Sequence, residues 1–137
     1  MRFVALVVAT LVFAAGAGAA NANRECSKSD SANAQKAIDR VMTWTQLQKS
    51  FQDFGQCDSG EVAEAYSDAL LRLLVDWQDV PALASAMADP AFKQFVMAHL
   101  KSASKEDRDA VYSRAKSNCP DGKEAFCGEL AEAAKAK

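Results

Sequence analysis

An apolar run at the N-terminus constrains this chain more than any other feature, because it determines where the protein folds. One positive charge, Arg2, precedes an almost wholly apolar stretch from Phe3 to Ala15, and small residues then lead to Ala20-Asn21-Ala22. This order is typical of a secretory signal peptide that is cleaved after an Ala-x-Ala site. The apolar core is shorter than the roughly 20 residues that a membrane span needs. We therefore expect a signal peptide over residues 1–22, a mature domain over residues 23–137, and no stable membrane anchor.

The mature part contains all four cysteines, and an even number in an exported chain predicts two disulfides. Four cysteines allow three pairings, and we favour the one in which each bond brackets a single helical segment or turn. The expected disulfides are Cys26–Cys57 and Cys119–Cys127. No metal site or cofactor is expected, because the cysteine spacings match no zinc pattern and no cofactor motif is present.

The charge balance excludes one class of partner. The whole chain has 16 basic and 18 acidic side chains, and one of the basic ones, Arg2, belongs to the predicted signal peptide. The mature domain therefore carries excess negative charge. A nucleic-acid-binding protein needs a basic patch, and the sequence has none. Anionic membrane surfaces are disfavoured for the same reason.

Helical periodicity recurs in block after block of the mature sequence, and no stretch alternates convincingly between apolar and polar residues. We expect an all-α fold: a compact single domain of six or seven short helices, held by the two disulfides. The expected helices cover 31–42, Thr43 to Gly55, Asp58 or Ser59 to Trp77, Pro81 to Ala88, Ala91 to Leu100, Ser104 to Ser117, and a last one around Ala125 to Leu130, with residues 131–137 frayed.

The sequence gives little reason to expect catalysis. Its one histidine, His99, lies near the end of a predicted helix, and we interpret it as a surface or capping side chain. A catalytic imidazole needs a nucleophile and an orienting partner, and the thiols are expected to be bonded. Common hydrolase, metalloprotease and phosphate-binding motifs are missing. We therefore expect no catalytic residues and no enzymatic activity.

Three carboxylates of the longest predicted helix share one face, because they lie at positions i, i+3 and i+7. We expect Gly55 to permit a left-handed turn before this helix, Asp58 and Ser59 to cap it, and Arg72 to pair with Asp68 or Asp76. Two interpretations stay open: an ordinary solvated face, or an acidic stripe that docks a basic protein. The residues expected at such a contact are Glu61, Glu64 and Asp68, with Gln56 and Ser59 exposed nearby.

Most of the stretch from Trp44 to Cys127 resembles a family of small exported bacterial proteins. The resemblance rests on the runs CDSGEVAEAYSDALLRLLVDW and DPAFKQFVMAHL, and on NCP ahead of a final cysteine. Such proteins carry a Cys-Asp-x-Gly helix start and are similar to periplasmic immunity proteins, which neutralise antibacterial effectors injected by rival cells. Helical amidase immunity proteins of type VI secretion are an architectural parallel. The resemblance implies a periplasmic location and a toxin as partner, but no individual contact residues.

Two functions therefore remain open. The first is a periplasmic immunity protein that blocks a toxin with a basic contact surface by occluding it. The second is a periplasmic stress or chaperone-like binding protein without catalytic activity. A homodimer is compatible with both, and a neighbouring toxin gene would favour the first.

Overall fold

The computed structural model describes residues 24–135, so the predicted signal peptide lies outside the described residues. Within this range the chain forms seven α-helices, one 3-10 turn and no strand, which confirms the all-α prediction. The elements are α1 (Lys28–Ile38), α2 (Trp44–Phe54), η1 (Gly55–Cys57), α3 (Gly60–Val75), α4 (Val80–Ala86), α5 (Pro90–Ser102), α6 (Lys105–Ser117) and α7 (Glu124–Lys135).

Short polar side chains start most of the helices. Thr43, Asp89 and Ser104 cap α2, α5 and α6, because each side-chain oxygen accepts a hydrogen bond from a backbone N–H of the first turn. The cap of α1 was missed. Ser27 starts this helix, which therefore begins at Lys28 and not at residue 31.

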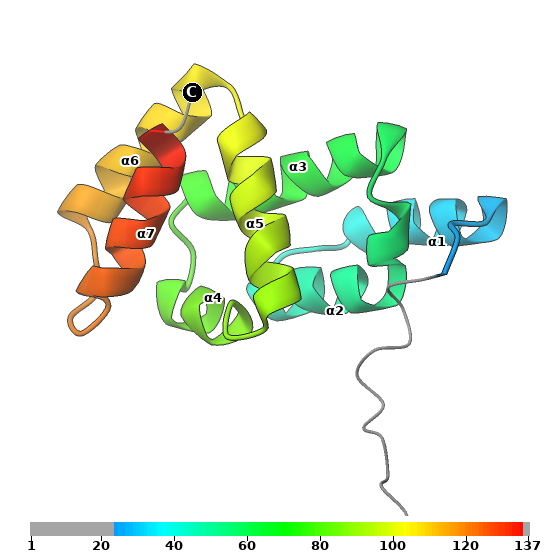
Figure 1. Cartoon of the computed structure of the whole chain (residues 1–137), viewed down its shortest axis with the longest axis horizontal. Coiled ribbons are helices and arrows are strands. Elements are labelled where there is room, and N and C mark those ends of the chain that lie inside the picture. The colour runs from blue at the N-terminus through cyan, green and yellow to red at the C-terminus, as the bar shows by residue number, and fades with distance from the viewer. Residues whose placement is uncertain (1–23, 136–137) are drawn as a thin grey trace, which may run out of the picture.

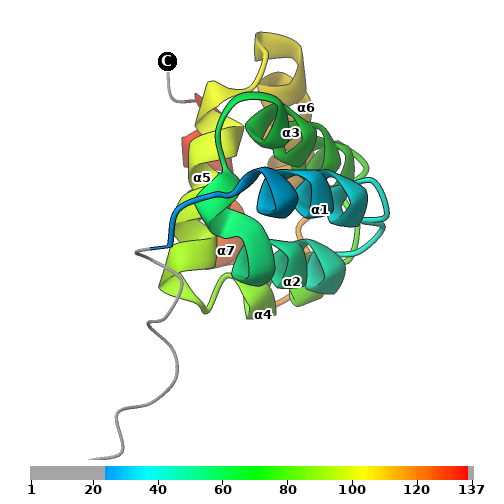
Figure 2. The same ribbon diagram turned by 90° about the vertical axis from the view of Figure 1, so that its right-hand side faces the viewer.

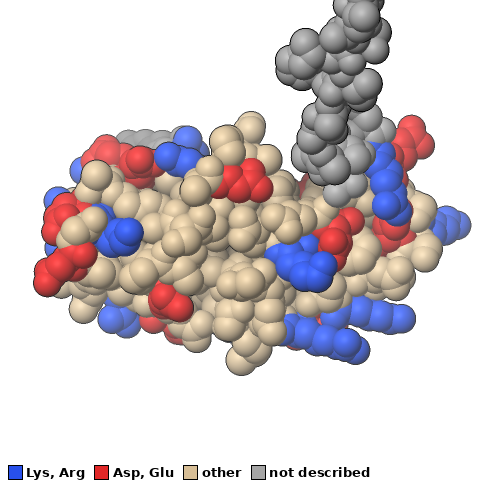
Figure 3. Space-filling model, turned by 90° about the horizontal axis from the view of Figure 1, so that it is seen from below, with Lys and Arg blue, Asp and Glu red and all other residues tan. Residues whose placement is uncertain are grey.

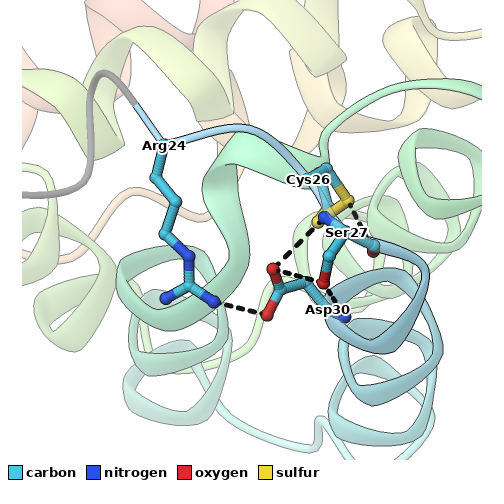
Figure 4. A network of polar contacts seen from close by, with 5 residues as sticks. Arg24, Cys26, Ser27 and Asp30 are labelled. Atoms are coloured by element: carbon cyan, nitrogen blue, oxygen red, sulfur yellow. Dashed lines mark hydrogen bonds and ion pairs between the residues drawn. A yellow bond between two sulfur atoms is a disulfide. The ribbon is translucent and has the colours of Figure 1, made fainter.

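The first turn of α1 is fixed by a small polar network (Figure 4). The hydroxyl of Ser27 accepts from the backbone N–H of Asp30, and the Asp30 carboxylate accepts from the backbone N–H of Ser27. Arg24 donates to the other carboxylate oxygen at 2.6 Å. The hydrogen bonds from Ser27, followed by the Arg24 contact, lower the pKa of Asp30. The carboxylate thus ties the N-terminal segment to the start of α1.

The helices are arranged around α3, which contacts α1, α2, α5 and α6 (Figures 1 and 2). The helices α1 and α2 form one end of the molecule, and α6 and α7 pack side by side at the other end. Buried apolar residues from all the α-helices join in one continuous core. The largest fully buried side chains are Trp44, Tyr66, Phe92, Leu47, Leu70, Leu73, Leu74, Leu83, Leu100 and Leu130.

Both predicted disulfides are confirmed. Cys26–Cys57 links the segment before α1 to η1, just ahead of α3. Cys119–Cys127 links the turn after α6 to α7. With both bonds formed, no cysteine between residues 24 and 135 is free. Two disulfides fit an exported protein, because such bonds persist in oxidising compartments.

The C-terminal segment differs from the prediction. The helix α7 continues to Lys135, and its alanines Ala131, Ala133 and Ala134 are buried against the rest of the protein. Their small side chains allow close packing, so the expectation of a frayed tail was wrong for residues 131–135, and residues 136–137 lie outside the described range. None of the helices between residues 24 and 135 is both long and apolar enough to span a membrane.

Candidate functional site

The turn that leads into α3 is shaped by two glycines. Gly55 has φ −58°, so the predicted left-handed turn at this residue is wrong. The reason for glycine here is space, because a Cβ atom would lie 2.9 Å from the Phe51 ring. The left-handed residue is Gly60, with φ +53°, at the first position of α3. The backbone between these glycines places Asp58 beside α5.

Asp58 does not cap α3 as expected. The N-cap of α3 is Ser59, whose side chain makes no capping hydrogen bond, and Oδ2 of Asp58 instead lies 3.1 Å from Nε2 of His99 on α5. On the other side of the imidazole, Nδ1 lies 2.7 Å from Oγ of Ser67 in the middle of α3. Asp58, His99 and Ser67 therefore form a continuous hydrogen-bonded chain between α3 and α5.

His99 is buried, with 9% of its surface exposed, so the interpretation of a surface histidine was wrong. Its ring also packs edge-on against Phe95, with ring centroids 4.5 Å apart. These contacts hold the imidazole in one orientation. His99 thus has both the hydroxyl partner and the orienting carboxylate that the sequence did not reveal.

The chemistry of the three groups assigns the direction of each hydrogen bond. A carboxylate only accepts hydrogen bonds, so Nε2 of His99 donates its hydrogen to Asp58. In the neutral imidazole Nδ1 is then the acceptor, and Ser67 donates its hydroxyl hydrogen to it. The hydroxyl proton of Ser67 therefore points at an unprotonated ring nitrogen.

An open hollow of about 340 Å³ lies where this chain reaches the surface between α3 and α5. We call it the His99 hollow. It is lined by Asp58, Ala63, Glu64, Ser67, Ala98, His99 and Ser102. Apart from His99, the ionisable side chains of this lining are Asp58 and Glu64. Both are carboxylates, so the hollow carries negative charge.

Glu61, Glu64 and Asp68, which we call the acidic face, are all exposed along α3, as the helical spacing predicted. Glu61 accepts a hydrogen bond from Gln35 of α1 at 3.4 Å. Within the described chain, neither Glu64 nor Asp68 has a hydrogen-bonding or ion-pair partner for its side chain. Two of the three carboxylates are thus left to solvent.

The expected pairing of Arg72 was wrong. Its guanidinium donates to the backbone carbonyl oxygen of Val41 at 2.7 Å and forms no ion pair with Asp68 or Asp76 in the described chain. The carbonyl lies in the turn between α1 and α2, where it has no helical partner. Arg72 therefore serves the packing of α3 against that turn and leaves its acidic neighbours unneutralised.

The two remaining residues expected at the contact behave differently. Ser59 is exposed at the start of α3, in agreement with the prediction. Gln56 is half-buried, and both polar atoms of its amide are shielded from solvent without a hydrogen-bond partner between residues 24 and 135. The expectation that Gln56 is exposed was therefore wrong, since η1 turns this side chain inward.

Buried Tyr66 lies one residue before Ser67 and faces the core. Its hydroxyl donates to the backbone carbonyl oxygen of Ser50 at 2.9 Å and lies 3.2 Å from the Ser50 hydroxyl. Burial, opposed only in part by these hydrogen bonds, raises the pKa of Tyr66 to about 12. This pair fixes α3 against α2 on the side opposite to the solvent-facing carboxylates.

Two other parts of the described surface carry charges of both signs. Figure 3 shows the face that lies at the bottom of Figure 1, where uncharged residues fill the middle and charged side chains of both signs lie around the edges. The helix α4 contains no charged residue. A groove of about 640 Å³ between α5 and α7 carries both signs, since Lys93 and Lys101 face Glu129 and Glu132.

No family model, curated protein or solved structure matches this chain. Nor do residues 24–135 contain a cluster of three or more His, Cys, Asp or Glu side chains arranged to hold a metal ion. The geometry of the described residues therefore defines the candidate site. It consists of the acidic face of α3 and the adjoining His99 hollow.

Proposed function

We propose that this protein is a periplasmic immunity protein that binds an antibacterial toxin and blocks it by occlusion, with the acidic face of α3 docking on a basic surface of the toxin. The observation that carries the proposal is that Glu64 and Asp68 form no ion pair with any residue between 24 and 135. Residues 51–80 contain seven acidic side chains and one basic one, Arg72, which is turned toward Val41. A basic partner would supply the missing charge.

The way α3 is held also supports a binding role. The disulfide at Cys57, the His99 contact and the Tyr66 hydrogen bonds fix the helix at its start and along its buried side. A surface that is rigid before binding loses less conformational entropy when the complex forms. Such a helix presents Glu64 and Asp68 in a fixed arrangement.

The chaperone-like alternative has no comparable support. Chaperones of that kind bind through apolar surface. Between residues 24 and 135, Met42 is the one large apolar residue that is exposed rather than buried or half-buried, at 63% of its surface. Two disulfides and one continuous core also favour a rigid protein over one that opens.

Protection of a sensitive cell from the toxin tests the proposal. The test partner is the product of a toxin gene next to this one, produced with and without this protein in the periplasm of a sensitive cell. Restored growth, together with a complex of the two purified proteins, is the expected result. A toxin that kills equally well in the presence of this protein would contradict the immunity function.

The double variant Glu64→Lys/Asp68→Lys then locates the contact. We expect association to slow by about 10-fold or more at low salt and by less at high salt, since screening weakens charge steering beyond the Debye length. The matched control is Asp121→Lys/Glu132→Lys, which makes the same change of net charge at two exposed sites, in the turn before α7 and in α7 itself. Equal slowing by both variants would assign the effect to net charge and not to the acidic face.

A further inference from the structure

We propose that Ser67 is the nucleophile of an acyl-transfer site in the His99 hollow, with His99 as its base and Asp58 orienting the imidazole, and that the site takes esters that carry a positive charge. This inference goes beyond the proposed toxin binding and does not depend on it. It rests on three hydrogen-bonded groups in the order that nucleophilic catalysis needs, at the wall of an open hollow.

The hydrogen-bond directions make Ser67 the proton donor of the chain. Its Oγ lies 2.7 Å from Nδ1 of His99, within the distance at which a base takes a proton. The Asp58 carboxylate, 3.1 Å from Nε2, stabilises the imidazolium that forms. In familiar serine hydrolases the serine bonds Nε2 and the carboxylate Nδ1. Here the two ring nitrogens are exchanged, and either nitrogen of a neutral imidazole serves as the acceptor.

Burial keeps this arrangement in place. His99 is 9% exposed and packs against Phe95, so its ring has little freedom to rotate away from Ser67. Ser67 itself is half-buried and lines the hollow, where a substrate reaches its hydroxyl from solvent. A buried base beside an accessible hydroxyl is the arrangement expected of a reactive serine.

The lining of the hollow selects the substrate class. Glu64 is exposed one turn before Ser67 and has no partner for its carboxylate in the described chain. Together with Asp58 it favours a cationic group beside the reacting carbonyl and disfavours an anionic one. An ester with a guanidinium or ammonium group therefore fits better than a neutral ester of equal size.

The reaction balances without any further cofactor. Oγ of Ser67 attacks the ester carbonyl carbon while its proton moves to Nδ1 of His99, and the same proton then leaves with the alcohol or phenol. Water afterwards attacks the acyl-serine ester by the reverse route, which releases a carboxylic acid and restores Ser67.

The rate of this reaction is limited because α3 offers no free backbone N–H group beside Ser67 to stabilise an oxyanion. The backbone N–H groups around Ser67 are used in the hydrogen bonds of α3, so they are not free to stabilise an oxyanion. Losing a single oxyanion donor already costs roughly 100-fold to 1,000-fold in rate. We therefore expect reaction with activated esters and accumulation of the acyl-serine form.

The test uses 4-nitrophenyl 4-guanidinobenzoate, an activated cationic ester, with 4-nitrophenyl benzoate as its neutral counterpart. The expected result is a burst of one equivalent of 4-nitrophenol and a matching mass increase at Ser67. We expect the cationic ester to react about 10-fold faster than the neutral one, and Glu64→Gln to remove most of this preference.

Two serine variants make the test specific. Ser67→Ala should lower the burst rate at least about 100-fold, because it removes the nucleophile that the His99 base activates and that carries the acyl group. Ser113→Ala, which alters an exposed serine of α6 outside the hollow, should leave it unchanged. A burst that survives Ser67→Ala, or a label on another residue, would overturn the proposal. So would the absence of any burst from the folded wild-type protein, whereas toxin binding by Ser67→Ala reports on the proposed immunity function alone.

Discussion

Removing the disulfide Cys26–Cys57 should destabilise the protein more than removing Cys119–Cys127. The two bonds differ mainly in the length of chain that they close, with sequence separations of 31 and 8 residues. On the loop-entropy model these lengths correspond to about 3.7 and about 2.6 kcal/mol. The predicted difference is therefore about 1 kcal/mol.

The packing losses of the two changes largely cancel. In each bond one cysteine is buried in the core, Cys57 at 1% and Cys127 at 2% exposure. Replacing both cysteines of a pair by alanine thus removes one fully buried sulfur atom in either case, with a smaller additional loss at half-buried Cys119, which packs against the core, whereas Cys26 is exposed. The difference in stability between the two double variants therefore comes mainly from the entropy of the unfolded chain.

Thermal unfolding followed by circular dichroism measures the effect. For a domain of about 115 residues, 1 kcal/mol changes Tm by about 4 °C, so we expect losses of about 15 °C for Cys26→Ala/Cys57→Ala and about 10 °C for Cys119→Ala/Cys127→Ala. Urea unfolding of the same variants gives the free energies directly. Equal losses, or a larger loss for the shorter loop, would refute the argument from loop length.

Three further predictions follow from individual residues. Gly55→Ala should cost about 1–3 kcal/mol in urea unfolding, because its Cβ meets the Phe51 ring at 2.9 Å, whereas Gly128→Ala has open space and should gain about 1 kcal/mol of helix propensity. A stable Gly55→Ala protein would contradict the clash. Because the pKa of Tyr66 is raised to about 12, the unfolded state loses the phenol proton first, and stability should fall by about 1.4 kcal/mol between pH 9 and pH 11 relative to Tyr66→Phe; parallel pH profiles would count against it. The mass of the exported protein should correspond to a chain that begins at Asn23, and a full-length chain in the membrane fraction would disprove cleavage.

Local signals were sufficient to predict much of the fold. Helix caps such as Thr43 and Asp89 act within one turn, and the spacing of apolar residues marks which face of each helix is buried. The favoured disulfide pairing, in which each bond brackets a single helical segment or turn, was also correct. The frayed tail was predicted wrongly because alanines carry little apolar signal. Their burial in α7 depends on close contact with helices that are remote in the sequence.

The candidate site was predicted only in part, since its contacts join distant segments. The acidic face follows from helical spacing alone. Asp58 and His99 are 41 positions apart in the sequence, and Ser67 and His99 are 32 positions apart. No local sequence pattern therefore indicates these two hydrogen bonds. The contact of Arg72 with Val41 is equally remote, and it displaced the expected pairing within the helix. A lone histidine gave no signal that a hydroxyl and a carboxylate would meet it.

If the chain is exported as its N-terminal sequence predicts, the pairing of its cysteines bears on how it matures. A polypeptide that emerges from a translocation channel N-terminus first presents its cysteines one after another, and here the first joins the second and the third joins the fourth. An oxidase that links each new thiol to the one already waiting would therefore produce the native bonds directly. Reshuffling of wrong disulfides, which takes from seconds to hours, is then unnecessary. Maturation of this chain should accordingly depend on an oxidant and not on a disulfide isomerase.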